Sequence, residues 1–253
     1  MTSTSRASRP APAMAIWRAQ TRMEARLTLR RGESVLLTFA IPMVILGFFS
    51  FVDVLPTGGG DAVDFLFPGV LALAVMSTAF VSTAIATGFE RQMGVLKRLG
   101  ATPLSRGQLL VAKTTSIMLI EVMQITVLLV QGLIIGFRFS GPNVWTLVAG
   151  LVLGTVAFAG LGLLMAGSLP ALTTLAAANG VYLFMLLLSG IMFPLDQLPA
   201  GLEAFSRLLP SSALVEIVHG SLGSGQIRAT AWIVLVTWAI AAPLAARRTF
   251  RWE

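Results

Sequence analysis

Residues 90–113 read ERQMGVLKRLGATPLSRGQLLVAK, a basic and amphipathic stretch between two apolar runs of membrane-spanning length. The stretch carries too much positive charge to lie in the hydrocarbon core. It is also too short to bury a core of its own and fold as a domain. We therefore expect it at the cytoplasmic mouth of a helix bundle, where a soluble partner could push on the membrane part.

The composition places the chain in lipid. Apolar residues make up 56% of the 253 residues and charged residues only 11%, whereas soluble domains carry about 25% charged residues. The sequence has no cysteine and one histidine, His219, which excludes disulfides, zinc–thiolate sites and multi-histidine metal sites. The net charge of +7 could indicate nucleic acid, but the basic residues cluster beside apolar runs, so we expect no nucleic-acid partner.

Six apolar runs have the length of transmembrane helices, which need about 20 residues. These runs are 35–52, 65–88, 109–137, 144–167, 171–194 and 229–246. We expect helices because lipid offers no water to unpaired backbone groups, and because the runs do not alternate in polarity as barrel strands do. The sequence thus predicts an all-α membrane protein with six transmembrane helices, divided into a cytoplasmic segment at 1–34 and a six-span domain at 35–253.

The distribution of positive charge predicts the orientation, because basic residues favour the cytoplasmic side. Fifteen of the 18 basic residues lie on one side, in the N-terminal tail, around residues 91–113 and in the C-terminal tail. The other side has only Arg138, Arg207 and Arg228, together with six of the 11 acidic residues. Both termini are therefore expected in the cytoplasm.

Two segments outside the spans have recognisable patterns. Residues 14–31 place Ile16, Trp17, Met23 and Leu27 on one side and arginines at four-residue spacing on the other. This pattern predicts an interfacial amphipathic helix that contacts membrane lipid; the alternative is a disordered basic tail that only sets the topology.

The second such segment, 194–225, lies before the last span. Its prolines bracket two apolar pieces near 200–209 and 211–222, which are too short to span. We predict an extracellular re-entrant helical hairpin, and the alternative is a solvated loop with ordinary helical turns. His219 belongs to this segment and is expected at the surface.

The stretch at 90–113 resembles the conserved intracellular loop of ABC type-2 transporter permeases. That loop has a glutamate, a basic residue, a glycine, a basic–leucine pair, and then Ala-Thr-Pro with a basic residue. The matching positions here are Glu90, Arg91, Gly94, Leu96, Lys97, Arg98, Leu99, Ala101, Thr102, Pro103, Ser105 and Arg106. The six-run layout, the interfacial helix and the outer hairpin extend the resemblance over nearly the whole chain.

The resemblance implies the permease subunit of an ATP-driven exporter in a bacterial cell membrane. The sequence contains no GxxxxGK[ST] phosphate-binding loop, so two separate ATPase subunits would bind ATP and Mg, and a second permease copy or a related permease would complete the assembly. Within the segment 89–108, a coupling helix would sit in a groove of the ATPase. The contact candidates are Glu90, Arg91, Leu96, Lys97, Arg98, Leu99 and Pro103. The alternative is a loop that contacts only water and lipid.

The third apolar run carries Glu121, an acidic residue within a membrane span. At about 100° per residue, Lys113, Gln124 and Gln131 lie on the same side of the helix. This polar stripe indicates either a substrate path or gate, or a static hydrogen-bond network between helices. Asn179 and Tyr182, in the fifth run, could also contact substrate, although packing is the simpler role.

Two further positions in the apolar runs bear on helix packing. Gly150 and Gly154 form a GxxxG pattern in the fourth run, which predicts close approach of another helix. Pro42 lies within the first run, where we expect it to kink or interrupt the helix.

The expected cargo is an amphipathic small molecule such as a drug, an antibiotic or a lipid, and the alternative cargo is a cell-envelope lipid or glycan. A membrane scaffold or regulator that does not transport is the alternative function. An intramembrane enzyme would need catalytic side chains clustered within the spans. We therefore expect no catalytic residue and no metal site in this chain.

Overall fold

The computed structural model describes residues 12–30, 32–52, 62–102, 104–191, 195–223 and 225–250, and the regular elements within these ranges are all helical. In chain order they are α1 (Ala13–Arg30), α2 (Gly32–Phe51), α3 (Ala62–Val75), η1 (Met76–Ser82), α4 (Thr83–Gln92), α5 (Val95–Gly100), α6 (Arg106–Ile135), α7 (Val144–Ser168), α8 (Ala171–Leu187), η2 (Leu195–Gln197), α9 (Ala200–Ser206), α10 (Pro210–Ser221) and α11 (Ala229–Thr249).

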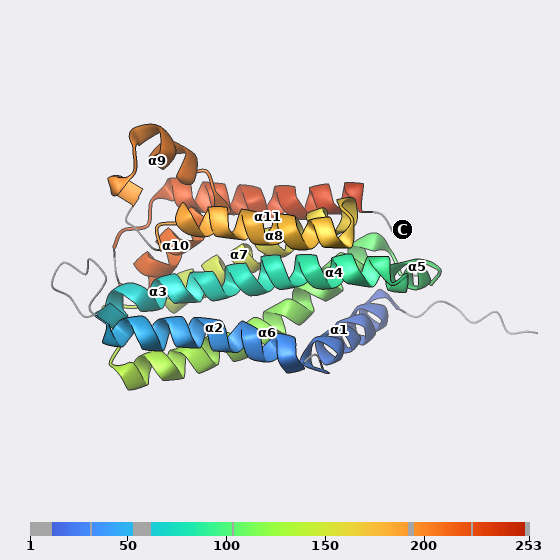
Figure 1. The fold of residues 1–253 in the computed structure, drawn as a ribbon, viewed down its shortest axis with the longest axis horizontal. Coiled ribbons are helices and arrows are strands. Elements are labelled where there is room, and N and C mark those ends of the chain that lie inside the picture. Colours follow the sequence, from blue (N-terminus) through green and yellow to red (C-terminus); the bar gives the residue numbers. More distant parts are fainter. Residues whose placement is uncertain are drawn as a thin grey trace, which may run out of the picture.

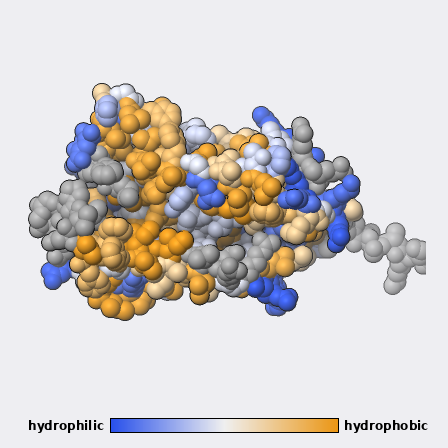
Figure 2. Space-filling view, viewed as in Figure 1, coloured by the Kyte–Doolittle hydropathy of each residue, from blue (hydrophilic) through white to orange (hydrophobic). Residues whose placement is uncertain are grey.

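The long helices form one elongated bundle. α1, α5 and the C-terminal end of α11 lie at one end of the bundle, and α9 lies at the other (Figure 1). On the face shown in Figure 2, hydrophobic side chains cover broad areas between the ends of the bundle, with more hydrophilic ones near the centre, and strongly hydrophilic side chains gather at the end that holds α1 and α5. Broad hydrophobic areas with hydrophilic side chains at the bundle end suit a bundle that crosses a bilayer.

Four helical stretches of the described chain are long and apolar enough to cross a membrane: Ala62–Gln92, Arg106–Ile135, Val144–Ser168 and Ala229–Thr249. They confirm the prediction of a multi-pass, all-α membrane protein. The other two predicted runs contain shorter apolar helices, Thr38–Phe51 and Ala171–Leu187.

The helix in the fifth run ends earlier than we predicted. α8 stops at Leu187, and Gly190 then adopts a φ of 85°, a left-handed conformation that an α-helix cannot continue through. The first run differs in another way, because α2 includes Pro42 and the proline therefore does not interrupt the helix.

The helix α7 lies at the centre of the bundle and contacts α11, α4, α10 and η1. Its glycines permit this close packing. A Cβ atom on Gly150 would lie 2.5 Å from Cγ2 of Ile217, and one on Gly154 would lie 2.9 Å from Cδ1 of Leu214. Both contacts are with α10, so the close approach predicted from the GxxxG pattern is confirmed.

The stretch Ala62–Gln92, called the second span below because it contains the second predicted run, is not a regular α-helix throughout, because Met76–Ser82 forms a π-helix. Here the helix widens where α7 comes closest: a Cβ on Gly162 would lie 2.7 Å from the main-chain oxygen of Phe80. Neither glycine nor proline occurs within this π segment, so the sequence analysis gave no sign of it. Such π segments are frequent at functional sites.

The amphipathic helix predicted at 14–31 is present as α1, so a disordered tail is the wrong alternative for these residues. Its faces differ from the prediction, however. α1 buries the polar residues Gln20, Thr21 and Glu24, and it exposes Met23 and Leu27 next to its arginines. The polar face is buried because it packs against α6, where it meets polar partners.

The two short helices predicted before the last span are also present, as α9 and α10. α10 is largely buried and contacts α7, α11 and α3, whereas α9 exposes Leu202 and Phe205. The prediction of a surface histidine is wrong. His219 is half-buried, because packing of α10 on α3 brings its ring next to Gly69 and Phe65.

Candidate functional site

The basic segment folds as a short helix between two turns. α4 ends at Gln92, Gly94 takes a φ of 71°, and α5 follows. Ser105 then caps α6: its hydroxyl accepts from the backbone N–H of Gln108 at 3.2 Å, and the Gln108 side chain accepts from the backbone N–H of Ser105 at 2.9 Å. This reciprocal capping box fixes the start of α6, so α5 is held between two spans.

The side chain of Leu96 anchors α5 to the bundle. Leu96 is fully buried in an apolar cluster at this end, together with Leu109 of α6, Leu163 of α7 and Phe250 after α11, and Leu99 packs on the same cluster. The structure therefore does not leave Leu96 available for the direct ATPase contact that we expected. The groove that it occupies belongs to its own chain.

Two other contact candidates also turn inward. Arg91 donates through Nη2 to the main-chain oxygen of Leu169 at 2.5 Å, which places a cation at the C-terminal end of α7, where the helix dipole favours it. Glu90 is only 7% exposed. Lys97 and Arg98 do lie on the exposed surface, and Pro103 falls outside the described residues.

Met93 is a residue of this segment that the sequence analysis missed. It is 61% exposed at the turn between α4 and α5. An exposed methionine beside exposed cations is an adaptable apolar contact, and its position directly before Gly94 is the signal that could have identified it.

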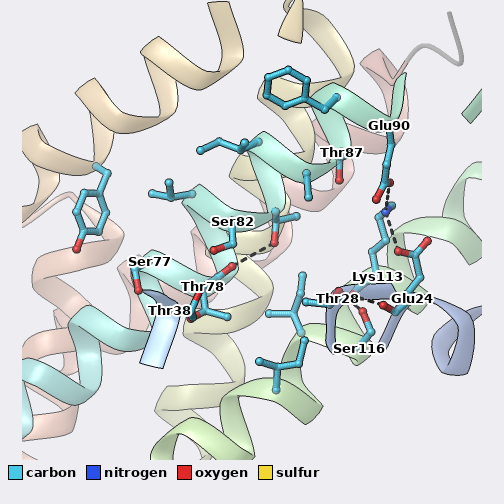
Figure 3. A pocket seen from close by; sticks show the side chains of 18 of the residues that line it. Glu24, Thr28, Thr38, Ser77, Thr78, Ser82, Thr87, Glu90, Lys113 and Ser116 are labelled. Carbon is cyan, nitrogen blue, oxygen red and sulfur yellow. Dashed lines mark hydrogen bonds and ion pairs between the residues drawn. The ribbon is translucent and has the colours of Figure 1, made fainter. Parts of the chain in front are cut away.

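The charge of Lys113 is balanced within a buried ion cluster. Its Nζ atom lies 2.9 Å from Oε2 of Glu24 and 2.6 Å from Oε2 of Glu90. All three residues are at most 7% exposed, and Gln20 donates to the other oxygen of Glu24 at 2.9 Å. The cluster joins α1, α4 and α6 (Figure 3). Removing one partner of such a buried ion cluster is costly, because a charge is left without compensation.

Gln124 and Gln131 of the predicted stripe contact the backbone of α2. Gln124 donates to the main-chain oxygen of Thr38 at 2.8 Å, and Gln131 donates to that of Met43 at 2.8 Å. In addition, Gln124 accepts from the hydroxyl of Thr78 at 2.9 Å. These are contacts of a hydrogen-bond network between spans.

Glu121 faces α7 instead. It is 3% exposed and accepts a hydrogen bond from the hydroxyl of Thr155. Its second oxygen is buried and has no hydrogen-bond partner among the described residues. The stripe therefore faces the interior of the bundle, and its role as a path or gate remains a prediction.

A cavity of about 690 Å³ lies between α1, α2, the second span, α6 and α8. Asn179 and Tyr182 line it, whereas Glu121, Gln124 and Gln131 do not. Hydroxyl groups predominate among its polar side chains, and the ion cluster of Glu24, Glu90 and Lys113 closes one side (Figure 3). The π segment contributes Ser77, Thr78 and Ser82. Of the predicted substrate-path residues, the structure thus brings only Asn179 and Tyr182 to one cavity.

The cavity and the basic segment both lie within the part of the chain that matches a known family. Residues 16–222 match the family model described as ABC-2 type transporter. The chain belongs to this family. It is therefore an ABC-2 type permease, a membrane subunit of a transporter, as the resemblance of residues 90–113 implied.

Curated relatives of this permease are distant in sequence. The chain is 25% identical over 159 residues to the probable multidrug ABC transporter permease YbhR of Escherichia coli K12, a match that covers 60% of this chain and 42% of YbhR. It is 26% identical over 217 residues to the putative transport permease YvfS of Bacillus subtilis 168, which covers 82% of this chain and 87% of YvfS. The permease thus matches less than half the length of YbhR and most of YvfS.

The ion cluster of this permease was missed in the sequence analysis. Lys113 was assigned to the stripe of Glu121, although a lysine inside an apolar run needs a nearby counter-ion. The predicted cytoplasmic segments 1–34 and 89–108 contain three acidic residues, Glu24, Glu33 and Glu90. This short set of candidate counter-ions is the signal that could have pointed to the cluster.

Proposed function

We propose that this chain is the permease subunit of an ATP-driven exporter in a bacterial cell membrane. Two permeases, identical or related, assemble with two ATPase subunits that bind ATP and Mg. The observation that carries the proposal is the match of residues 16–222 to the ABC-2 type transporter family. The exposed side chains of Met93, Lys97 and Arg98 support it, because they offer an apolar contact at the turn before α5 and two cations on α5 itself.

The topology that we propose has six spans: α2, Ala62–Gln92, α6, α7, α8 and α11. Both termini lie in the cytoplasm, and α9 and α10 form a re-entrant hairpin in the outer leaflet. In support, the end of the bundle with α1 and α5 also holds the C-terminal end of α11 (Figure 1). At the opposite end, the exposed Leu202, Phe205 and Leu208 of the hairpin suit a lipid environment.

This topology can be tested without background labelling, since the chain has no cysteine. In intact cells a membrane-impermeant maleimide should label a single cysteine in place of Ser140, whereas a single cysteine in place of Ser105 should react only after the membrane has been permeabilised. Labelling of both positions from the same side would contradict the proposed arrangement.

Coupling follows from the way in which α5 is held. A force on the exposed face of α5 is passed to the ends of α6, α7 and α11 through the buried Leu96. The same force reaches α1 through the ion cluster, because Lys113 bonds both Glu24 and Glu90. The cavity is bounded by α1, the second span and α6, so these two connections tie the docking surface to its walls.

We propose an amphipathic small molecule, such as a drug, an antibiotic or a lipid, as the cargo of this cavity. The word multidrug in the name of YbhR supports this class, and a volume of about 690 Å³ lies within the range of about 300–1,000 Å³ of small-molecule sites. A cell-envelope lipid or glycan is the alternative cargo, and a scaffold that does not transport is the alternative function.

The deciding experiment is co-purification followed by reconstitution. The permease should isolate with an ATPase, and the complex in proteoliposomes should move a fluorescent amphiphile only when ATP is supplied. A complex whose ATPase lacks its phosphate-binding lysine is the control. ATP hydrolysis by the permease alone, or a stable permease that binds no ATPase, would overturn the proposal; the second result would favour the scaffold.

A further inference from the structure

Many hydroxyl groups that line the cavity have already used their single proton. Thr28 donates to the main-chain oxygen of Glu24 at 3.0 Å, and Ser77 donates to that of Ala74 at 3.0 Å. A hydroxyl has one donor and two acceptor lone pairs. Each of these side chains can therefore still accept a hydrogen bond from a molecule in the cavity, but it cannot donate one without breaking its own bond.

The same pattern holds deeper in the cavity. Thr83 donates to the main-chain oxygen of Thr78 at 3.3 Å, and Ser116 donates to that of Lys113 at 2.8 Å. The hydroxyl of Thr78 is committed to the side chain of Gln124 at 2.9 Å. Five lining hydroxyls, from α1, the second span and α6, therefore present acceptor lone pairs.

Other lining groups strengthen this excess of acceptors. Glu24 and Glu90 have carboxylates, which only accept, and the ammonium of Lys113 is directed at both of them. Asn179 donates one N–H to the main-chain oxygen of Leu175 at 2.8 Å, which leaves its amide oxygen as an acceptor and one N–H as a donor. The described lining has no arginine, tryptophan or histidine, so its remaining N–H donors are those of Asn179 and Lys113, beside the O–H of Tyr182.

The rest of the lining is apolar. Ile41 of α2, Val81 and Ile85 of the second span, and Ile117 and Ile120 of α6 contribute hydrocarbon surface. A molecule that fits both parts of this lining has an apolar body and a polar head that donates hydrogen bonds. A head that only accepts would gain no hydrogen bond from these five hydroxyls, whereas each bond from a donor to one of them contributes about 0.5–1.5 kcal/mol.

We propose that the cavity selects cargo by its hydrogen-bond donors, so that the cargo is an amphiphile whose head group carries N–H or O–H groups. This inference rests on the proposed function only in that the cavity holds the cargo. It adds a chemical criterion that neither the family nor the relatives supply: at equal charge, a donor-bearing head is preferred.

Two matched pairs of probes test the criterion on the purified full-length permease in nanodiscs. Both pairs share one dansyl-labelled alkyl chain. The first pair ends in a primary ammonium or a trimethylammonium, which have the same charge; the second ends in an alcohol or its methyl ether, which are uncharged. From dansyl fluorescence we expect the donor-bearing member of each pair to bind about tenfold more tightly, the ratio that corresponds to about 1.4 kcal/mol.

A triple variant, Ser77→Ala with Thr83→Val and Ser116→Ala, should bring both affinity ratios close to one. Each of these three hydroxyls bonds only a backbone oxygen nearby in its own chain segment, so the helices keep their contacts with one another. The matched controls are Thr126→Val and Thr237→Val. These exposed residues make the same kind of bond, at 2.7 Å in each case, and do not line the cavity, so the controls should leave the ratios unchanged.

The outcomes separate this inference from the proposed function. Equal affinities within both pairs for the unaltered permease overturn the donor criterion, and this comparison requires no variant to fold. A preference that survives in a folded triple variant shows that the donors are read elsewhere and overturns the role of the cavity. The binding assay contains no ATPase, so its result does not depend on whether the permease exports with ATP. If the complex exports amphiphiles but shows no preference for donor-bearing heads, the proposed function stands and the donor criterion is rejected.

Discussion

The side-chain nitrogen Nε2 of Gln124 lies 2.8 Å from the main-chain oxygen of Thr38. In an α-helix that oxygen would accept from the N–H of residue 42, but residue 42 is proline and has no N–H. α6 therefore supplies the donor that α2 lacks, at a site where Gln124 is 1% exposed. In this way, Pro42 is accommodated within an apolar helix.

This relationship predicts a thermodynamic coupling between Pro42 and Gln124. Gln124→Leu should lower the free energy of unfolding by about 1–3 kcal/mol, because buried polar groups lose their partners. In a Pro42→Ala background the cost should fall by at least about 0.5 kcal/mol, since the restored N–H can serve Thr38. Thermal unfolding of the four purified proteins in detergent measures the cycle. Gln131→Leu is the control. It loses a hydrogen bond to Met43, so Pro42→Ala should not reduce its destabilising effect. Equal destabilisation by Gln124→Leu in both backgrounds would refute the coupling.

Leu96 and Met93 should separate stability from coupling. Leu96→Asp places a carboxylate in the apolar cluster that anchors α5. A large-to-small core substitution lowers the free energy of unfolding by about 2–5 kcal/mol, and we expect Leu96→Asp to lower it by at least as much. Met93→Asp changes an exposed side chain and should alter stability by less than about 0.5 kcal/mol, while it reduces ATP-dependent transport. Unfolding and transport are measured on the same preparations. Normal stability with lost transport in Leu96→Asp would restore Leu96 as a docking residue.

Lys113→Met should loosen α1. The change leaves Glu24 and Glu90 facing each other in a buried site, at a cost of about 3–5 kcal/mol. We expect faster trypsin cleavage at the arginines of α1 and a lower unfolding temperature. The control is Arg106→Met, at an exposed position on the same helix, which should change neither measurement. If the Lys113→Met protein resists trypsin as well as the parent protein does, the ion cluster does not hold α1.

The contact of Glu121 with Thr155 predicts a packing role. An amide can keep this hydrogen bond, so Glu121→Gln should preserve stability within about 0.5 kcal/mol, whereas Glu121→Leu should lower it by about 1–2 kcal/mol. Thr155→Val should add little to the effect of Glu121→Leu, because both remove the same bond. Since Glu121 does not line the cavity, export by Glu121→Gln should be normal at acidic and at alkaline pH. Impaired export by an assembled Glu121→Gln complex would instead support the path hypothesis.

Periodicity and apolar length were sufficient to predict the helices, because both are properties of neighbouring residues. The amphipathic pattern before residue 32 gave α1, and the prolines around Pro210 gave two short helices. The pattern did not reveal which face of each helix packs inside. Leu96 lies in a strongly basic segment, so charge alone suggested exposure, while the cluster that buries it comes from residues as distant as Phe250.

Polar partners within the membrane were equally hidden from a linear pattern. The sequence placed Gln124 on a polar stripe, but its acceptor lies on α2, 86 residues away. Pro42 has no N–H to donate to the main-chain oxygen of Thr38. Only the packing of α6 on α2 shows that Gln124 donates to it instead. The π segment was also invisible, because it contains neither glycine nor proline, and Gly162, which packs against it, lies about 80 residues further along the chain.

The pairing of Glu24 with Lys113 bridges 89 residues of chain, and this distance imposes an order on biosynthesis. When α1 leaves the ribosome, Lys113 has not yet been translated. Until α6 has been made, the buried face of α1, with Gln20, Thr21 and Glu24, has no α6 to pack against. A docked α1 is thus a mark of a nascent permease in which α6 is already in place.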